Sequence, residues 1–152
     1  RLQVLVEAEI QLEEQMGIRS KITMGEHPAL NEKVDAGADY IITQMFFDNR
    51  FYYDFVRRCR EAGIKVPIIP GLKPLSTARQ VNMLPESFSL DIPLELTEEI
   101  AKAGNDKEAV YRIGTEWCTM QCQDLIAHGV PAVHFYTMGK SRNIMEILKK
   151  CF

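Results

Sequence analysis

The stretch Val34-Asp35-Ala36-Gly37-Ala38-Asp39-Tyr40-Ile41-Ile42-Thr43-Gln44 joins the end of an amphipathic helix, through a glycine, to a short apolar run. The same arrangement recurs at 61–70, around Gly63, and at 127–136, around Gly129. Glycine is favoured just past a helix end because the chain often turns there through a left-handed conformation that a Cβ disfavours. Apolar runs without strict alternation are typical of strands covered on both faces, so their alternation with helices predicts parallel β/α units.

Further helices are predicted between and after these runs. Asp48 is placed to cap a helix of about 14 residues, and Ser76 is placed to cap a helix that carries Arg79 and Gln80. A short helix is expected at 96–103, a long one at 107–127, and a closing helix capped by Ser141. Residues 1–30 alternate like a strand but contain many helix-favouring side chains, and we expect them to be helical.

Composition narrows the class of protein. Hydrophobic residues make up 46% of the 152 residues and charged residues 26%, as in an ordinary globular domain. The net charge of −3 is spread over interspersed acidic and basic residues, which argues against nucleic acid or an anionic membrane as partner. No apolar run approaches the roughly 20 residues that span a bilayer, and the chain does not open with a signal-peptide pattern. We therefore expect a cytoplasmic protein, whose four scattered cysteines stay reduced.

The predicted strands end in segments that could hold a ligand. Three strands cannot close a barrel, so the repeat indicates part of a larger parent fold. In a (β/α) barrel, functional groups gather where the strands end, here at 43–48, 70–74 and 134–140. The amides, aromatic rings and lysine of these segments suit a flat heteroaromatic ligand, whereas a nucleophile and a base are not evident.

These segments, together with 33–39, resemble the methylenetetrahydrofolate reductase family. The matching motifs are Lys33-Val34-Asp35-Ala36-Gly37-Ala38-Asp39, Ile42-Thr43-Gln44-Met45-Phe46-Phe47-Asp48, Ile68-Ile69-Pro70-Gly71-Leu72-Lys73-Pro74 and His134-Phe135-Tyr136-Thr137-Met138. The resemblance runs from about residue 30 to the C-terminus, which divides the chain into 1–30, which does not match, and 31–152, the C-terminal part of the barrel. It implies the (β/α)8 TIM-barrel fold, here a partial barrel of about three C-terminal β/α units with extra helices.

The resemblance also implies an activity. Members are NAD(P)H-dependent flavin oxidoreductases that act on a CH-NH group: FAD takes hydride from NADH or NADPH and passes it to methylenetetrahydrofolate, giving methyltetrahydrofolate in one-carbon metabolism. By motif, Gln44 matches the glutamine that contacts folate and nicotinamide by turns, and Gln80 a second glutamine near the folate. Lys140 stands where many bacterial members have an arginine, and Lys33 matches a lysine that borders the FAD site.

The family's acidic residues near the flavin lie in an N-terminal half that this sequence does not contain. We therefore expect catalysis only in a complete barrel, formed as a homo-oligomer or with a complementing N-terminal half. Two alternatives remain open: a non-catalytic folate- or nucleotide-binding module, and an inert barrel fragment whose strand edges drive self-association.

Several candidate residues also have a purely structural interpretation. Gln44 could satisfy loop backbone groups, Lys140 could be a solvated surface residue, and His134 on its apolar strand is expected to be a core residue. Cys118 and Cys122 with His128 lack a recognised zinc spacing, so no metal site is expected. The aromatic residues at 46–53 are expected to fill a core or a subunit interface.

Overall fold

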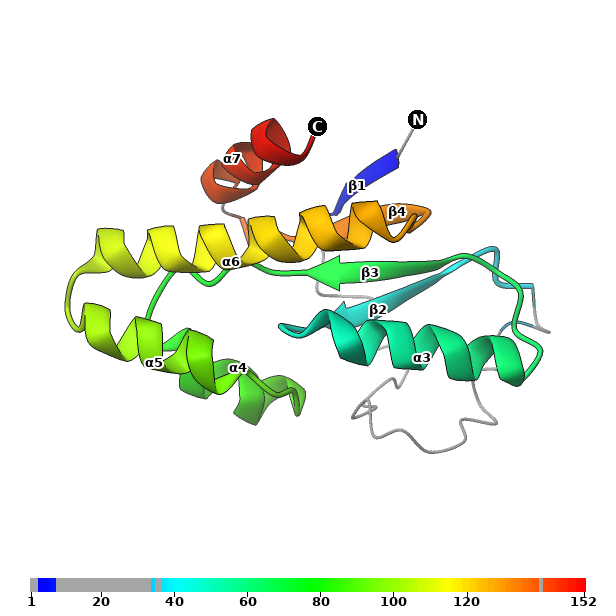
Figure 1. The fold of residues 1–152 in the computed structure, drawn as a ribbon, viewed down its shortest axis with the longest axis horizontal. Helices are drawn as coiled ribbons and strands as arrows, with labels where there is room; N and C mark the ends of the chain where they lie inside the picture. Colours follow the sequence, from blue (N-terminus) through cyan, green and yellow to red (C-terminus); the bar gives the residue numbers. More distant parts are fainter. Residues whose placement is uncertain (1–2, 8–33, 35–36, 140) are drawn as a thin grey trace.

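A parallel sheet forms the centre of the protein. The computed structural model describes residues 3–7, 34, 37–139 and 141–152. Within them, one sheet has the strand order β1-β4-β3-β2, and every pair is parallel (Figure 1). The strands are β1 (Gln3–Glu7), β2 (Ile41–Met45), β3 (Ile68–Leu72) and β4 (Ala132–Tyr136). The α/β class and the parallel pairing predicted from the sequence are therefore confirmed, while the sheet of the described residues is open rather than a closed barrel.

Helices connect these strands as the sequence pattern predicts. They are α3 (Asn49–Glu61), α4 (Gln80–Phe88), α5 (Leu94–Ala103), α6 (Lys107–Ala127) and α7 (Arg142–Cys151). Each of β2, β3 and β4 is followed by helix, which gives the three β/α units expected, and α4 and α5 are the extra helices between β3 and α6. No helix in the described part of the chain is both long and apolar enough to cross a membrane.

The predicted helix signals are correct at some ends and wrong at others. Asp48 caps α3, because its carboxylate accepts a hydrogen bond from the backbone N–H of Arg50 at 2.9 Å. Gly63 and Gly129 follow α3 and α6 with φ of +86° and +73°, as expected of glycines that end helices. The prediction that Ser76 caps α4 is wrong: Gln80 begins that helix, and its own Oε1 accepts from the backbone N–H groups of Ser76 and Thr77.

The closing helix also differs from the prediction in one detail. Ser141 is the residue that precedes α7, but its side chain makes no capping hydrogen bond. Within the first turn, the Oδ1 atom of Asn143 instead accepts from the N–H of Ile144 at 3.0 Å. The Asn143 side chain, rather than Ser141, thus accepts a hydrogen bond from a backbone N–H of the first helical turn.

The expectation of helix in residues 1–30 is wrong for residues 3–7. They form β1, which pairs in parallel with β4 from Gln3 opposite Ala132 to Glu7 opposite Tyr136. The edge of β4 would otherwise present a row of unpaired N–H and C=O groups, and pairing with β1 satisfies them, so tertiary context overrides local helix propensity. The remainder of this segment, 8–30, lies outside the described residues.

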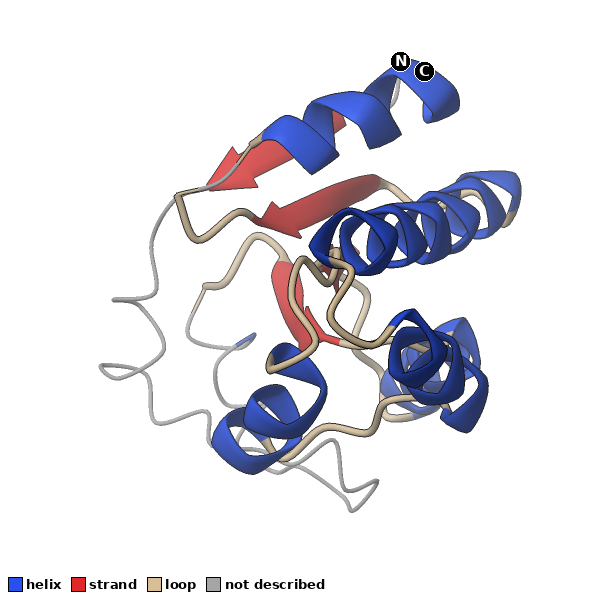
Figure 2. Cartoon of the chain, turned by 90° about the vertical axis from the view of Figure 1, so that its left-hand side faces the viewer, coloured by secondary structure: helices blue, strands red, loops and turns tan. Residues whose placement is uncertain are grey.

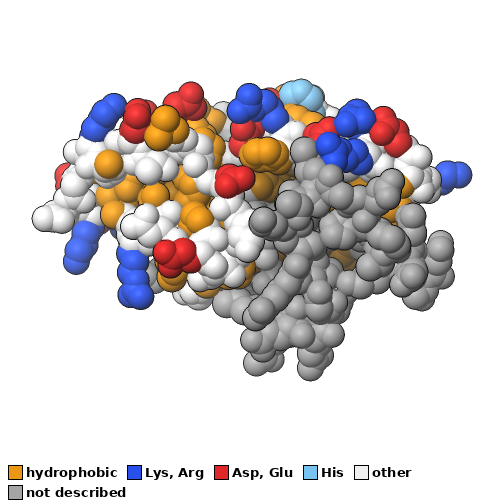
Figure 3. All heavy atoms as spheres, turned by 90° about the horizontal axis from the view of Figure 1, so that it is seen from below, with side chains coloured by type: hydrophobic (Ala, Val, Ile, Leu, Met, Phe, Trp, Pro, Cys, Tyr) orange, Lys and Arg blue, Asp and Glu red, His pale blue; other side chains and the backbone are white. Residues whose placement is uncertain are grey.

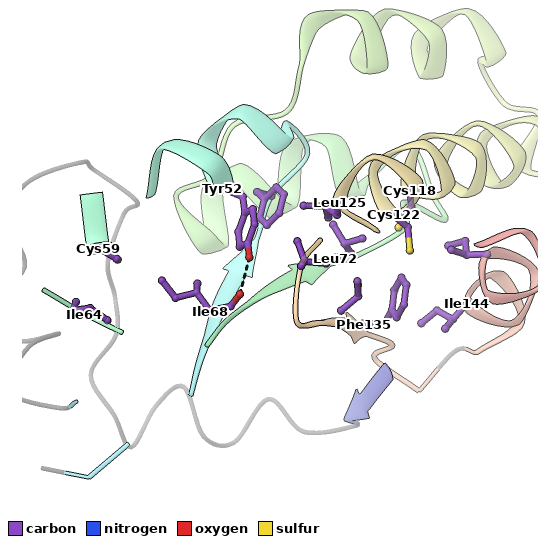
Figure 4. Packing of buried hydrophobic residues seen from close by; sticks show 14 residues of the cluster. Tyr52, Cys59, Ile64, Ile68, Leu72, Cys118, Cys122, Leu125, Phe135 and Ile144 are labelled. Carbon is purple, nitrogen blue, oxygen red and sulfur yellow. Dashed lines mark hydrogen bonds between the residues drawn. The ribbon is translucent and has the colours of Figure 1, made fainter. Parts of the chain in front are cut away.

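The main hydrophobic core lies between the sheet and the helices α3, α6 and α7. Figure 4 shows Leu72 and Phe135 on the sheet pointing toward Leu125 of α6 and Ile144 of α7. Because side chains alternate along a strand, this places His134 and Tyr136, the neighbours of Phe135, on the opposite face of β4. Figure 2 shows the helices of this core gathered around the strands.

A second core cluster lies at the carboxyl end of the sheet. In Figure 1 the arrowheads of β2 and β3 point toward the side on which α4 and α5 lie. Side chains from the end of β2, the loop after β3, α4, α5 and α6 pack there: Met45, Phe47, Leu75, Leu84, Leu96, Ile100 and Val110. Seen from below, hydrophobic side chains reach the surface on the left of Figure 3, over α4 and α5, with charged groups around them. The extra helices thus cover the end of the sheet where a site was predicted.

Candidate functional site at the strand ends

Three strand ends are tied together around a glycine. The hydroxyl of Tyr136, at the end of β4, donates a hydrogen bond to the carbonyl oxygen of Thr43 on β2 at 2.9 Å. Between them, Gly71 of β3 donates its N–H to the Thr43 hydroxyl at 3.0 Å. A Cβ at Gly71 would lie 2.5 Å from the Thr43 carbonyl oxygen and 2.7 Å from Cε2 of Tyr136. The glycine of the Pro-Gly-Leu-Lys-Pro motif is therefore needed for close approach of the tyrosine ring to the backbone.

The ends of β2, β3 and β4 form a rim at this edge of the sheet. Gln44 lies on it, next to the last residue of β2. Its side chain is half-buried, and its Oε1 accepts from the backbone N–H of Met45 at 2.9 Å. This bond fixes the orientation of the carboxamide, whose nitrogen carries two donor hydrogens. Gln44, which was predicted to be the main ligand contact, is thus held at the strand end. Its bond to a backbone N–H is the structural role that the sequence left open as the alternative.

The segment that follows Gln44 is anchored by α6. The indole Nε1 of Trp117 donates to the carbonyl oxygen of Phe47 at 2.9 Å, and Nε2 of Gln121 donates to that of Phe46 at 3.2 Å. Sequence analysis did not single out either residue of α6. The signals were the single tryptophan of the chain and a glutamine on the apolar face of a long helix. Both side chains fix the path of the backbone immediately after Gln44.

Lys73 is a second feature that sequence analysis missed. The side chain follows directly after β3, is 4% exposed, and its Nζ lies 3.5 Å from the carbonyl oxygen of Tyr136, to which it donates. Lysine is seldom fully buried unless it has partners, so this position is unusual. The available signal was a single charged residue within the otherwise uncharged stretch 68–75; the structure buries 71–75 throughout. The contact links the end of β3 to the end of β4 and places the Lys73 amino group next to the Tyr136 carbonyl oxygen.

Gln80 stands at the beginning of α4, half-buried, beyond the loop that follows β3. Its Oε1 stabilises the turn at Ser76 and Thr77, with distances of 2.7 and 3.1 Å to their backbone nitrogens. Leu84, one turn further along α4, is fully buried in the second core cluster.

The other two predicted contacts, Lys140 and Lys33, lie outside the described residues. His134 is a core residue, as predicted: it is 4% exposed, and its ring packs edge-on against Tyr136 with 4.6 Å between centroids. Of the aromatic residues at 46–53, which were expected to fill a core or a subunit interface, Phe46, Phe47 and Tyr52 are buried, whereas Phe51 is 39% exposed. Among the described residues, no group of three or more His, Cys, Asp or Glu side chains is placed to hold a metal ion.

Asp48 is the carboxylate nearest to the end of β2 along the chain. The Arg50 guanidinium donates to it at 2.6 Å, and this hydrogen bond is the main cause of a pKa below the usual value of an aspartate. The group is therefore ionised at neutral pH and occupied as a helix cap. It is a poor candidate for the general base.

An open cavity of about 460 Å³ lies beside these strand ends, between the loop after β3 and the beginnings of α6 and α7. Its wall carries several charged and hydroxyl side chains and contains a cation–π pair, because the Arg142 guanidinium lies 4.8 Å from the ring centroid of Tyr111. The residues that line it are Ser76, Lys107, Glu108, Tyr111, Ser141, Arg142 and Asn143. Of the predicted site residues that the structure describes, neither Gln44 nor Gln80 lines it, so the cavity and the Gln44 rim are separate features of the same edge.

Comparison with known proteins gives a consistent family. The family profile described as methylenetetrahydrofolate reductase matches residues 15–151. A probable methylenetetrahydrofolate reductase (NADPH) of Caenorhabditis elegans is 40% identical over 121 residues, which is 79% of this chain and 18% of that protein. The 5,10-methylenetetrahydrofolate reductase of Escherichia coli is 36% identical over 112 residues, which is 74% of this chain and 38% of the relative. The chain therefore spans well under half the length of these relatives.

A solved structure shares the fold. It is an uncharacterized protein from Clostridium thermocellum that binds two copies of 5-methyl-5,6,7,8-tetrahydrofolic acid. It aligns with a TM-score of 0.50 and 18% sequence identity over 85% of this chain and 48% of that protein. At this level of identity the similarity concerns the arrangement of helices and strands.

Proposed function

Because the chain belongs to the methylenetetrahydrofolate reductase family, we propose that it is the C-terminal part of the (β/α)8 barrel of such a reductase and forms the folate side of its site. The observation that carries the proposal is the position of Gln44, fixed at the carboxyl end of a parallel strand, where barrel enzymes place their functional groups. The reaction is the reduction of methylenetetrahydrofolate to methyltetrahydrofolate in a cytoplasmic enzyme.

Gln44 would recognise the flat heteroaromatic part of the folate. The Gln44 carboxamide, whose oxygen accepts from the Met45 N–H, has the amide chemistry that suits a ring nitrogen or carbonyl of the ligand. Trp117 and Gln121 act as positioning residues, because they hold the backbone that follows Gln44. Gln80 would support the loop after β3, and Lys140 would meet a carboxylate of the substrate as a point charge.

The described residues do not by themselves fit FAD. The ring of Tyr136 takes up the space above Gly71 where a flat ligand could approach the backbone. When bound, the flavin would accept hydride from NADH or NADPH and deliver it to the folate. We propose that it is held mainly by strands that complete the barrel, and that this chain supplies orientation of the folate rather than redox chemistry.

The proposal can be tested by measuring flavin retention and reduction. The purified chain is mixed with FAD, desalted, and its visible absorption is recorded anaerobically before and after addition of NADH or NADPH. Retained flavin that bleaches with either nucleotide supports a reductase. If the chain retains no flavin and a methyltetrahydrofolate titration also gives no binding, the proposal is overturned. Folate binding without retained flavin is the result expected of a chain that supplies only the folate side of the site.

A further inference from the structure

Asn143 is a buried amide that joins two separate segments beside the strand ends. It is the second residue of α7 and is 4% exposed. Its Oδ1 accepts from the backbone N–H of Ile144 at 3.0 Å, and its Nδ2 donates to the Oγ of Ser76 at 3.1 Å. The side chain therefore uses its acceptor within its own helix and its donor on the loop that follows β3.

Ser76 is hydrogen-bonded through both its side chain and its backbone. Its hydroxyl oxygen accepts from Asn143, and its backbone N–H donates to the Oε1 of Gln80 at 2.7 Å. The same Oε1 also accepts from the backbone N–H of Thr77 at 3.1 Å. Asn143, Ser76 and Gln80 thus form one hydrogen-bond chain, which runs from the first turn of α7 to the start of α4.

The helix α6 fixes the loop just before Ser76. Leu75 is 1% exposed, and its carbonyl oxygen lies so close to Gly114 of α6 that a Cβ there would come within 2.0 Å of it. The start of α4 lacks a side-chain cap, because Arg79 makes no capping hydrogen bond. The two bonds of Ser76 therefore stabilise the turn that leads from β3 into α4.

We propose that Asn143 is a positioning residue for the folate, because it holds Gln80 in place through Ser76. The inference rests on the proposed function, in which the strand ends and the loop that Gln80 supports border the folate. Since the Oε1 of Gln80 is bonded to the N–H of Ser76, a displacement of Ser76 also displaces the carboxamide. Asn143 acts through Ser76 and does not itself touch the ligand.

Position 143 uses both the donor and the acceptor of a carboxamide. Asn143→Ala would remove the acceptor of the Ile144 N–H, which concerns α7, and the donor to Ser76, which concerns the loop. Ser76→Ala removes only the second bond and leaves the first turn of α7 unchanged. It therefore separates the positioning role of Asn143 from its role in starting the helix.

A double-mutant cycle in folate affinity tests the proposal. Isothermal titration gives the affinity for 5-methyltetrahydrofolate of the wild type, Asn143→Ala, Ser76→Ala, Gln80→Ala and the double variant at 143 and 80. Asn143→Ala and Ser76→Ala should each weaken binding about threefold to tenfold, and Asn143→Ala should have no further effect once Gln80 is replaced. Ser76→Thr, which keeps the hydroxyl, should bind like the wild type. Equal weakening by Asn143→Ala in both backgrounds, or none in either, would overturn the proposal.

Amide exchange without ligand keeps the test valid if Asn143→Ala fails to fold or a variant binds too weakly to measure. In Ser76→Ala, the N–H of Thr77, which is bonded to Gln80, should exchange faster than in the wild type. The N–H of Ala109, which is capped by an aspartate at the start of α6, should be unchanged. Unchanged exchange of Thr77 would overturn the positioning role even if the wild type binds folate. Undetectable folate binding by the wild type would overturn the proposed function as well, so the two failures are distinguishable.

Discussion

The hydroxyl of Tyr136 lies 2.9 Å from the carbonyl oxygen of Thr43, and this hydrogen bond joins β4 to β2 across the strand between them. It is compatible only with a residue that lacks a Cβ at position 71, because a Cβ there would come within 2.7 Å of the tyrosine ring. Two motifs far apart in the sequence, Pro-Gly-Leu-Lys-Pro and His-Phe-Tyr-Thr, are thus parts of one contact. The contact fixes the strand ends relative to one another.

Removing only this hydroxyl should weaken the sheet measurably. Tyr136→Phe keeps the ring but leaves the Thr43 carbonyl oxygen without the bond, and we expect a loss of about 1 kcal/mol in the free energy of unfolding in urea. Tyr111→Phe is the matched control: its hydroxyl donates to the partly exposed Glu146 at 3.2 Å, and its removal should change stability by less than about 0.5 kcal/mol. Equal effects of the two substitutions would show that the Tyr136 bond has no special role.

Gly114 should be intolerant of alanine although it lies within a helix. A Cβ at this position of α6 would lie 2.0 Å from the carbonyl oxygen of Leu75 in the loop after β3. Alanine normally gains about 1 kcal/mol over glycine in a helix, but overpacking of this kind costs about 1–3 kcal/mol and here involves backbone. We therefore expect Gly114→Ala to lower the thermal midpoint, whereas Glu116→Ala, at an exposed position two residues further along, should not. A stabilised Gly114→Ala protein would contradict the close approach of α6 to the loop.

Tyr52 predicts a loss of stability at alkaline pH. Its buried hydroxyl donates to the carbonyl oxygen of Ile68 at 2.6 Å, as the dashed line in Figure 4 shows, and burial raises its pKa from 10.0 to about 12. Because the folded-state pKa lies above the unfolded value, this stabilisation is complete below pH 10 and is lost as the pH rises from there toward about 12. Urea unfolding across this range should show a steeper decline for the wild type than for Tyr52→Phe. Parallel declines would refute the assignment.

The repeated helix-glycine-strand pattern predicted β2, β3 and β4 and the long helix α6 correctly, because burial on both faces and a glycine after a helix are local signals. The strand β1 could not be predicted in this way. Its composition is compatible with helix, and its conformation is decided by pairing with β4, more than a hundred residues away in the chain. Ser76 was assigned as a cap for a similar reason: the sequence does not reveal that Gln80 turns back to the same N–H groups.

The site was only partly accessible from sequence. Gln44 was found through its family motif, and the structure fixes its carboxamide through Met45. The residues that position the following backbone, Trp117 and Gln121, are about seventy positions away, and the sequence does not show that α6 packs against this segment. Lys73 lay inside a quoted motif, but its near-complete burial depends on how the ends of β3 and β4 pack.

The most direct test of the central claim is the affinity of the full chain for 5-methyltetrahydrofolate, measured by isothermal titration with wild-type, Gln44→Ala and Asn82→Ala proteins. Asn82 is an exposed amide on α4 and serves as the control. We predict saturable binding that is weakened about tenfold or more by Gln44→Ala, as expected for loss of a hydrogen bond worth about 1.4 kcal/mol, and that is unchanged by Asn82→Ala. Undetectable binding by the wild type, or equal affinity of the wild-type and Gln44→Ala proteins when both are folded, would contradict the claim that these strand ends form a folate site.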